Sequence, residues 1–184
     1  MMYIHKKIST QFDPVISSVR KTSKLVDCSG ASTFIIHNDL IVTEEYWGKH
    51  SNNTNSRPIQ EDTQFHVASV RKSYIGFAIA YAIHKGDIGS IDDSIIKYFP
   101  EGDAQILNGT TIRHLLTHTH GLKEVNGKII RECPSGKSWA YRGICVNLLT
   151  QILKNTTGKS VAEIVVDNVF SNLLILLRRD GMEI

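Results

Sequence analysis

The stretch Phe65–Gly86, "FHVASVRKSYIGFAIAYAIHKG", decides the fold class of this chain. Its residues 69–85 are apolar on nearly all sides of a helix, and such a helix is usually buried all round. His84 and Lys85 suit a C-terminal helical turn, and Gly86 suits the position that follows it. The sequence therefore predicts a central helix over residues 69–85, preceded by an extended segment.

The start of that helix holds a serine three residues before a lysine, a spacing that can carry nucleophilic catalysis. A serine hydroxyl is a poor nucleophile until a base takes its proton, and a lysine is such a base only when burial or nearby positive charge lowers its pKa. Residues i and i+3 share a helix face, so the amine of Lys72 can reach the hydroxyl of Ser69. Backbone N–H groups at a helix start lower the lysine pKa further and can stabilise an oxyanion.

Three pairs in the chain have this spacing: Ser18 with Lys21, Ser69 with Lys72, and Ser94 with Lys97. Ser18 lies inside a predicted helix with polar neighbours, where backbone N–H groups are already bonded. Two aspartates precede Ser94, and their charge would raise the pKa of its lysine. Ser69 opens a strongly apolar helix and is the candidate. The alternative is that Ser69 only caps the helix and Lys72 is a surface lysine with a buried stem.

Turn and cap signals divide the rest of the chain into elements. Asp13 and Pro14 start a helix that the apolar pattern carries to about Leu25. The run "STFIIHNDLIVTEEYWG" predicts two strands around a turn at residues 37–39, followed by a polar surface loop. Four helical segments are predicted further on: a short one between Asp93 and Pro100, one capped by Thr110 or Thr111 that ends near Gly121, one over residues 141–158 closed by Gly158, and one opened by the capping box Ser160–Glu163.

Composition and charge exclude several classes of function. The hydrophobic and charged fractions, 41% and 21%, are those of a globular fold and not of a disordered chain. The net charge of +3 is dispersed, so no nucleic-acid partner is expected. The longest apolar stretch, "YIGFAIAYAI", is too short to span a bilayer, and residues 1–14 lack the apolar core of a secretory signal. We therefore expect a cytoplasmic protein, or an exported one whose leader has been removed.

The three cysteines do not form a disulfide framework. Cys28, Cys133 and Cys145 contain no C-x-x-C pair, and their number is odd. This pattern favours reduced thiols in a reducing compartment, with a Cys133–Cys145 disulfide as the alternative.

A histidine cluster raises the question of zinc. The spacing of His114 and His118 would put both on one helix face, and His120 follows. No glutamate lies between the first two, as it does in H-E-x-x-H sites, and no fourth ligand is evident. We therefore expect no metal and no cofactor.

Three blocks of the sequence resemble the serine β-lactamase and penicillin-binding-protein-like hydrolases, and most closely the class C β-lactamase-related branch. The first, "FHVASVRKSYIGFAIAYAIHKGDIGSIDDSIIKYFPE", resembles the nucleophile segment of that family. The second, "TTIRHLLTHTHGL", resembles the block T-I-R-H-L-L-T-H-T-S-G-L. The third, "PSGKSWAYRGICVNLLTQILKNTTGKSVAEIV", resembles the segment that leads to Y-x-N and a helix. The blocks occur in the expected order and span most of residues 32–170.

The resemblance implies a role for each matching residue. Ser69 would be the acylated nucleophile, its backbone N–H would form half of the oxyanion hole, and Lys72 would relay its proton. Tyr141, the first residue of Y-x-N, would protonate the leaving group and activate water for deacylation. A free phenol has a pKa of about 10, so nearby positive groups would have to lower the pKa of Tyr141.

Three departures from the family pattern bear on the site. Gly143 stands where the family has the substrate-binding Asn of Y-x-N, and a glycine cannot supply that amide. His120 replaces the usual Ser of H-T-S-G, a block that is mainly structural. The family's third catalytic element, K-T-G or H-x-G, lies on a strand beyond the length of this chain. We therefore expect a truncated relative without the C-terminal strands of the family.

The resemblance thus predicts an α+β fold, a β-lactamase/transpeptidase-like sandwich of an antiparallel sheet with flanking helices, as one incomplete domain over residues 1–184. Residues 1–66 would supply the N-terminal helix and strands, and residues 67–184 the nucleophile helix and the helical region. The expected function is serine hydrolysis through an acyl-enzyme, on a small-molecule or peptide substrate that is an ester, a β-lactam or a D-amino-acid amide. The alternative is an inactive remnant or a binding module. Strands without their family partners would leave open edges, through which we expect self-association.

Overall fold

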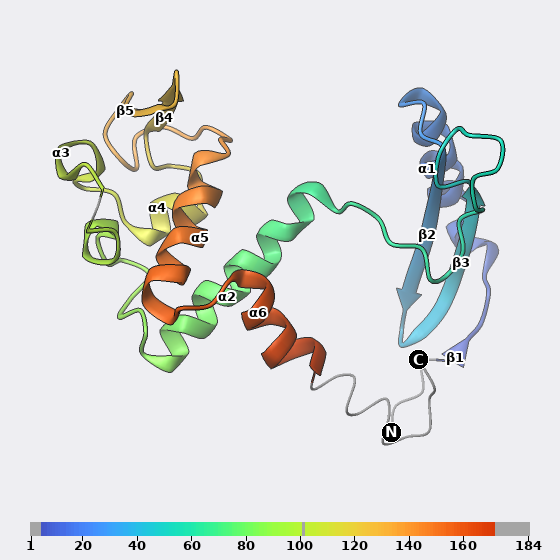
Figure 1. Ribbon diagram of the computed structural model, residues 1–184. Coiled ribbons are helices and arrows are strands. Elements are labelled where there is room, and N and C mark those ends of the chain that lie inside the picture. The colour runs from blue at the N-terminus through green and yellow to red at the C-terminus, as the bar shows by residue number, and fades with distance from the viewer. Residues whose placement is uncertain (1–4, 101, 172–184) are drawn as a thin grey trace. The chain divides into compact units, whose positions relative to one another are not determined.

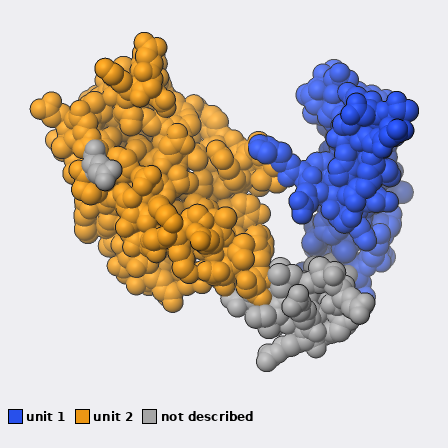
Figure 2. All heavy atoms as spheres, in the orientation of Figure 1, with its two compact units in different colours: residues 1–66 blue, residues 67–184 orange. Residues whose placement is uncertain are grey.

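The structure is a computed structural model that describes residues 5–100 and 102–171. Its contacts group the chain into two compact units, Met1–His66 and Val67–Ile184 (Figures 1 and 2). The predicted nucleophile helix lies in the second unit, which therefore carries the candidate site.

The first unit holds one longer helix and a three-stranded sheet. Helix α1 spans Asp13–Leu25 and follows the short strand β1, His5–Lys6, and the 3-10 turn η1, Thr10–Phe12. Strands β2, Gly30–His37, and β3, Leu40–Gly48, pair antiparallel, and β1 joins β3 in parallel, in the order β1-β3-β2. The predicted N-terminal helix and both predicted strands are confirmed.

The turn between β2 and β3 has the geometry that its residues favour. Asn38 and Asp39 both have positive φ, 50° and 58°. Two such residues in succession form the tight turn whose twist matches that of a hairpin, and Asn and Asp tolerate positive φ better than most residues. The chain therefore reverses at the residues that the sequence indicated.

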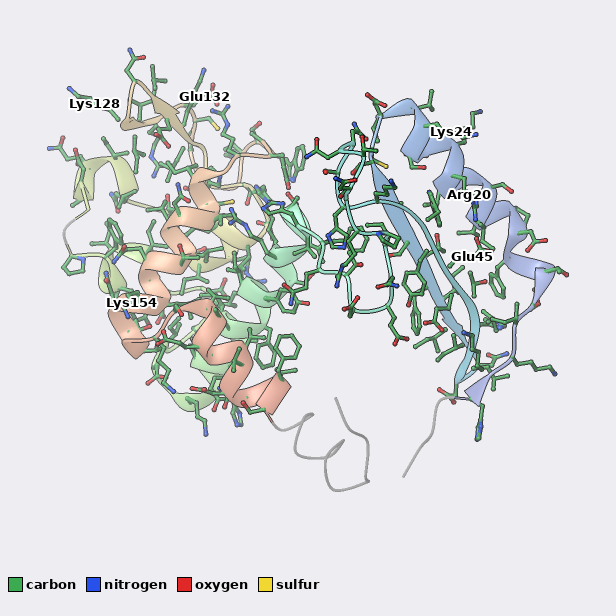
Figure 3. The ribbon with its side chains drawn as sticks, turned by 45° about the vertical axis from the view of Figure 1, so that its right-hand side comes forward. Arg20, Lys24, Glu45, Lys128, Glu132 and Lys154 are labelled. Atoms are coloured by element: carbon green, nitrogen blue, oxygen red, sulfur yellow. The ribbon has the colours of Figure 1, made fainter. Side chains whose placement is uncertain are left out.

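Arg20 ties the helix of the first unit to its sheet (Figure 3). Its guanidinium donates a hydrogen bond to the Glu45 carboxylate of β3 at 2.8 Å and lies 4.6 Å from the ring centre of Trp47. The ion pair is largely exposed and contributes little by itself. The stacked guanidinium adds a cation–π contact that fixes which face of the sheet α1 covers.

The second unit is mainly helical. In chain order its elements among the described residues are η2 Ala68–Val70, α2 Arg71–Lys85, η3 Ile95–Tyr98, α3 Ala104–Leu107, α4 Ile112–Leu116, β4 Leu122–Val125, β5 Lys128–Arg131, α5 Ile144–Thr157, α6 Val161–Val165 and η4 Val166–Phe170. Helices α2, α5 and α6 pack against one another around the core (Figure 1). Gly86 and Gly158 end α2 and α5 with positive φ, and the capping box of Ser160 and Glu163 opens α6, all as predicted.

The sequence predicted that helix α2 is buried on all sides, and this prediction is wrong. The helix is buried on one face. Its buried side chains are Ile75, Ala78, Ile79 and Ala82, a stripe at helical spacing. Tyr74 and Phe77, on another face of the helix, are 39% and 37% exposed. Exposed aromatic residues, together with Val70 and Ala80, made the pattern look apolar on every side. No helix that the structure describes is long and apolar enough to cross a membrane.

Helix α4 is shorter than predicted and ends at Leu116, not near Gly121. Thr111 caps its start, as predicted, and accepts the N–H of His114. Two residues after the helix, His118 has a φ of 58°, which a right-handed helix cannot contain. Residues 117–121 therefore form an irregular turn that leads into β4, and not a helix.

The hairpin of β4 and β5 was not predicted. The two strands pair antiparallel around Asn126 and Gly127, whose φ values are 51° and 74°. An Asn-Gly pair between short alternating segments is the strongest local signal for such a hairpin. The signal was present in the sequence "LKEVNGKIIR".

Candidate active site

Ser69, Lys72 and Tyr141 meet in the second unit and form a closed triangle of hydrogen bonds. Lys72 Nζ donates to Ser69 Oγ and to Tyr141 Oη, each at 2.8 Å, and Tyr141 Oη donates to Ser69 Oγ at 2.6 Å. The structure thus brings together the three residues that the resemblance singled out. Every pair is within the reach that direct proton transfer requires.

The local backbone places the serine beside the lysine. Ala68 has a φ of 44°, which is unusual for a residue with a Cβ, and the chain turns there into η2. Ser69 lies in this 3-10 turn, and α2 begins at Arg71, two residues later than the sequence predicted. Because η2 runs directly into α2, the three-residue spacing still sets Lys72 against Ser69.

The ammonium group of Lys72 changes the acidity of Tyr141. Its hydrogen bond is the largest cause that lowers the pKa of the Tyr141 phenol, the bond with Ser69 adds to it, and desolvation opposes both. The Tyr141 side chain is 56% exposed, so solvent screens part of the effect. A lowered pKa is what a tyrosine needs to accept a proton closer to neutral pH.

An aromatic cluster that the sequence did not single out surrounds Tyr141. The ring centre of His118 lies 4.7 Å from that of Tyr141, with 31° between the planes. The Trp139 ring centre lies 6.4 Å from Tyr141 and 6.3 Å from His118. Residues two apart in an extended segment face the same way, so the order W-A-Y was a signal for the Trp139–Tyr141 contact. Nothing in the sequence indicated the contact with His118.

Gly143 occupies the N-cap position of α5 with a φ of −67°, which any residue can adopt. A Cβ at this position would meet no atom within 4 Å. Neither backbone nor packing therefore requires a glycine here, and an asparagine would fit.

The clustered histidines do not share a helix face, contrary to what their spacing predicted. Because α4 ends at Leu116, His118 lies outside it. The ring of His114 instead faces the cap of its own helix, with Nδ1 3.0 Å from Thr111 Oγ1. His114 therefore does not join His118 at a common site.

His118 and His120 approach Cys145 instead, with one potential ligand atom from each within 4.8 Å of the others. Nδ1 of His120 accepts the Leu122 N–H at 3.0 Å, so the neutral ring carries its proton on Nε2. Burial lowers the pKa of His120 to about 4 and keeps the ring neutral. Nε2 then carries the proton and is buried without a hydrogen-bond partner among the described residues. A metal ion there would have to displace that proton while Nδ1 stays bound to the Leu122 N–H, so these three side chains fit a metal ion poorly. The absence of a metal stays a prediction.

The three cysteines, all of which the structure describes, are free. Cys28 is exposed, Cys133 is partly buried and Cys145 is buried. The Cys145 thiol donates to the backbone oxygen of Arg142 at 3.0 Å, and burial raises its pKa. A buried protonated thiol of this kind is a packing group and not a nucleophile.

Comparison with known proteins supports the family that the three blocks indicated. Residues 19–177 match the family model for Beta-lactamase. An uncharacterized protein of Alkalihalophilus pseudofirmus is 67% identical over 94% of this chain and 50% of its own length. Esterase EstB of Burkholderia gladioli is 29% identical over 62% of this chain and 29% of its own length. The chain thus spans about half the length of the first of these relatives and less of the second.

Solved structures support the same fold. A class C beta-lactamase matches with a TM-score of 0.72 at 21% identity, over 88% of this chain and 48% of the other. D-alanine carboxypeptidase AmpC from Burkholderia cenocepacia matches with a TM-score of 0.72 at 20% identity, over 86% of this chain and 47% of the other. The predicted α+β class is confirmed by these matches. Because the family model covers most of its length, the chain belongs to the Beta-lactamase family.

Proposed function

We propose that the chain is a serine hydrolase that acts through an acyl-enzyme on Ser69. The observation that carries this proposal is the closed triangle of Ser69, Lys72 and Tyr141. It joins a nucleophile, a cation and a titratable phenol whose pKa is lowered. A serine needs these partners before its hydroxyl can attack a carbonyl group.

The triangle can carry each proton that acyl transfer moves. Tyr141, as a phenolate held by the Lys72 ammonium, takes the Ser69 proton while Ser69 Oγ forms a bond to the substrate carbonyl carbon. The Ser69 backbone N–H would face the oxyanion that results. When the bond to the leaving group breaks, Tyr141 passes the proton to the leaving oxygen or nitrogen. A water then attacks the acyl carbon while Tyr141 takes its proton. The bond between that carbon and Ser69 Oγ breaks, Tyr141 returns the proton to Oγ, and the acid is released.

The substrate is proposed as a compound with an acyl group on oxygen or nitrogen: an ester, a β-lactam or a D-amino-acid amide. The names of similar proteins span this range, since they include an esterase, a penicillin-binding protein and a D-alanine carboxypeptidase. All three chemistries pass through attack on a carbonyl carbon, which is what the triangle is suited to. The solved structures, at 21% identity or less, support the fold alone.

Turnover assays on matched variants test this proposal. An aryl ester, a penicillin and a D-alanyl dipeptide are offered in parallel to wild type, Lys72→Ala and Tyr141→Phe. We expect turnover of at least one substrate, and a loss of about 100- to 10,000-fold in each variant, the usual contribution of a positioned acid–base group. Lys21→Ala is the control because it alters the same "SVRK" sequence in the first unit. Equal turnover in wild type and both site variants would reject the proposal, and no turnover by wild type would favour a binding module.

A further inference from the structure

We propose that His118 is the residue that positions Tyr141 against Ser69 and Lys72. This inference rests on the proposed function, because it assigns a second role within the same site. His118 does not touch Ser69 and is not offered as a catalytic residue. It contacts Tyr141 and the residues on both sides of it.

Three contacts from His118 hold the Tyr141 segment. The backbone oxygen of His118 accepts the Ala140 N–H at 3.0 Å. Its ring nitrogen Nδ1 accepts the Arg142 N–H at 3.5 Å. Its ring faces the phenol, with 4.7 Å between the ring centres and 31° between the planes. One residue therefore binds the main chain before and after Tyr141 and packs on the side chain between them.

The turn that carries His118 is itself fixed to the core. Its N–H donates to the Leu115 oxygen at 3.3 Å, and the next residue, Thr119, donates to the His114 oxygen at 2.9 Å. Leu115 is fully buried. The φ of 58° at His118 turns the chain out of α4. Such a conformation is costly for a residue with a Cβ and persists where surrounding contacts hold it.

The tautomer of His118 follows from these contacts. Because Nδ1 accepts an N–H, the neutral ring carries its proton on Nε2. The groups near the ring include the Lys72 ammonium from α2, the Tyr141 phenol, and the Cys145 thiol from α5, whose Sγ lies 3.4 Å from Nδ1. The neutral His120 ring and the Trp139 ring also lie close to it. Burial, and then the charge of Lys72, lower the pKa of His118 and favour the neutral ring. A proton on Nδ1 would break the bond from Arg142.

Two variants test the ring of His118 and its acceptor atom Nδ1 independently. His118→Phe keeps an aromatic ring against Tyr141 but loses Nδ1. His118→Asn keeps an acceptor near the backbone and tolerates positive φ, but it loses the ring. His84→Asn, at the exposed last turn of α2, is the matched control. Thermal melting of each variant first establishes that it folds.

The first readout is the titration of Tyr141, followed by the ¹³Cζ signal of labelled tyrosine. Since contact with Lys72 lowers the Tyr141 pKa, displacement of the ring should raise that pKa toward the ordinary value of about 10. The second readout is the rate at which a fluorophosphonate labels Ser69. We expect a fall on the order of 10- to 100-fold in both His118 variants, as for a small misplacement of a reacting group. His84→Asn should match wild type in both readouts.

The two readouts distinguish failure of this inference from failure of the proposed function. If one folded His118 variant changes neither the Tyr141 titration nor the labelling rate, the contact that this variant removes does not position Tyr141. If neither variant changes these two readouts, the inference is overturned. If wild type does not label at Ser69 but the Tyr141 pKa still rises in the variants, the proposed function fails and the positioning role stands. A merely structural role for His118 would lower the melting temperature without moving the Tyr141 titration.

Discussion

At the scale of single residues, one ammonium group connects the nucleophile to the acid–base residue. Lys72 Nζ lies 2.8 Å from both Ser69 Oγ and Tyr141 Oη, and 4.7 Å from the centre of the Tyr141 ring. A positive charge this close favours the phenolate over the phenol. Desolvation acts in the opposite direction, so the lowered pKa of Tyr141 depends on the hydrogen bonds with Lys72, the larger cause, and Ser69.

Replacing Lys72 should therefore raise the pKa of Tyr141. In Lys72→Ala the largest cause of the lowered pKa is gone, so the phenol should titrate closer to its ordinary value of about 10. The phenolate that accepts the Ser69 proton then forms only at higher pH. We expect the labelling rate of Ser69 to rise with pH through the Tyr141 pKa, and this rise to begin at lower pH in wild type than in Lys72→Ala.

The titration is measured by phenolate absorbance, with Tyr141→Phe identifying this residue among the six tyrosines. Lys97→Ala is the control, since Lys97 also lies near a tyrosine ring, 5.0 Å from the centre of Tyr98. A Tyr141 that titrates at the same pH with and without Lys72 would contradict this prediction.

Gly143→Asn tests whether the lack of the family's asparagine amide lowers the rate of acylation at this site. The backbone conformation and the open space at Gly143 allow the substitution. Glycine gives the unfolded chain more conformational entropy than other residues do. Replacing it where another residue fits the native backbone raises the free energy of unfolding by about 0.4–1 kcal/mol, so both Gly143→Ala and Gly143→Asn should be more stable by that amount. Only the asparagine adds an amide to bind substrate, a hydrogen bond of about 1 kcal/mol, or roughly fivefold in rate. A penicillin that acylates both variants equally would show that the amide does not reach the substrate.

The residues of the triangle were predictable and the residue beside them was not. Ser69, Lys72 and Tyr141 each fall in a block whose order resembles a family, so the resemblance names them. The contact between His118 and Tyr141 depends on the positive φ at His118, which ends α4 early. No propensity scale predicts such a conformation for a histidine. The spacing suggested a helix face shared with His114, and the family resemblance implied a packing or hydrogen-bonding role for His118 without naming Tyr141 as its partner.

At the scale of elements, Arg131 at the end of β5 holds the β4–β5 hairpin to the segment around α3. Its guanidinium donates to the backbone oxygens of Ile106 and Asn108, each at 2.9 Å, and to Thr110 Oγ1 at 2.8 Å. It also donates to Ser135 Oγ at 3.0 Å, in the loop that leads toward the site. The planar guanidinium can serve all these acceptors at once, which a lysine cannot.

Arg131→Lys should therefore destabilise the protein by about 1–3 kcal/mol, because several partly buried acceptors and the buried Thr110 hydroxyl lose their charged donor. Arg113→Lys is the control, since Arg113 pairs with Asp92 at the surface, where an ion pair contributes about 0–1 kcal/mol. Chemical denaturation of both variants measures the difference. Equal stability of the two would mean that the Arg131 bonds do not hold the hairpin.

The elements that the sequence predicted are those with strong local signals. Asp13 and Pro14 start α1, Asn38 and Asp39 reverse the chain, and Gly158 ends α5, because each of these residues favours its conformation independently of the fold. The one-sided burial of α2 depends instead on which neighbours pack against it. A short run such as α3 was missed because four residues carry little periodicity. The β4–β5 hairpin was missed although Asn126 and Gly127 signal its turn.

At the scale of the whole molecule, the sheet of the first unit has β2 as its long edge strand, opposite the two-residue strand β1. Among the described residues β2 pairs with β3 alone. It also exposes two large apolar side chains, Phe34 at 54% and Ile36 at 49%. An edge strand with exposed apolar side chains is a template for pairing with another chain.

We expect the protein to self-associate through β2, and Phe34→Lys to reduce this association, because a charge on an edge strand opposes pairing. Light scattering over a concentration series measures it. Val15→Lys makes the same change at an exposed apolar residue that lies on helix α1 and not on the edge strand, and should leave the association as it is. A wild-type protein that stays monomeric at all concentrations would contradict this expectation.

The central claim, that Ser69 is the nucleophile, can be tested against an internal control. "SVRK" occurs at residues 18–21 and 69–72, and both serines are exposed, so neither the four-residue motif nor accessibility distinguishes them. Only Ser69 has the Lys72 and Tyr141 contacts. Intact mass and peptide mapping after fluorophosphonate treatment should show one adduct on wild type and on Ser18→Ala, located at Ser69, and none on Ser69→Ala. An adduct that persists in Ser69→Ala, or that maps to Ser18, would contradict the claim.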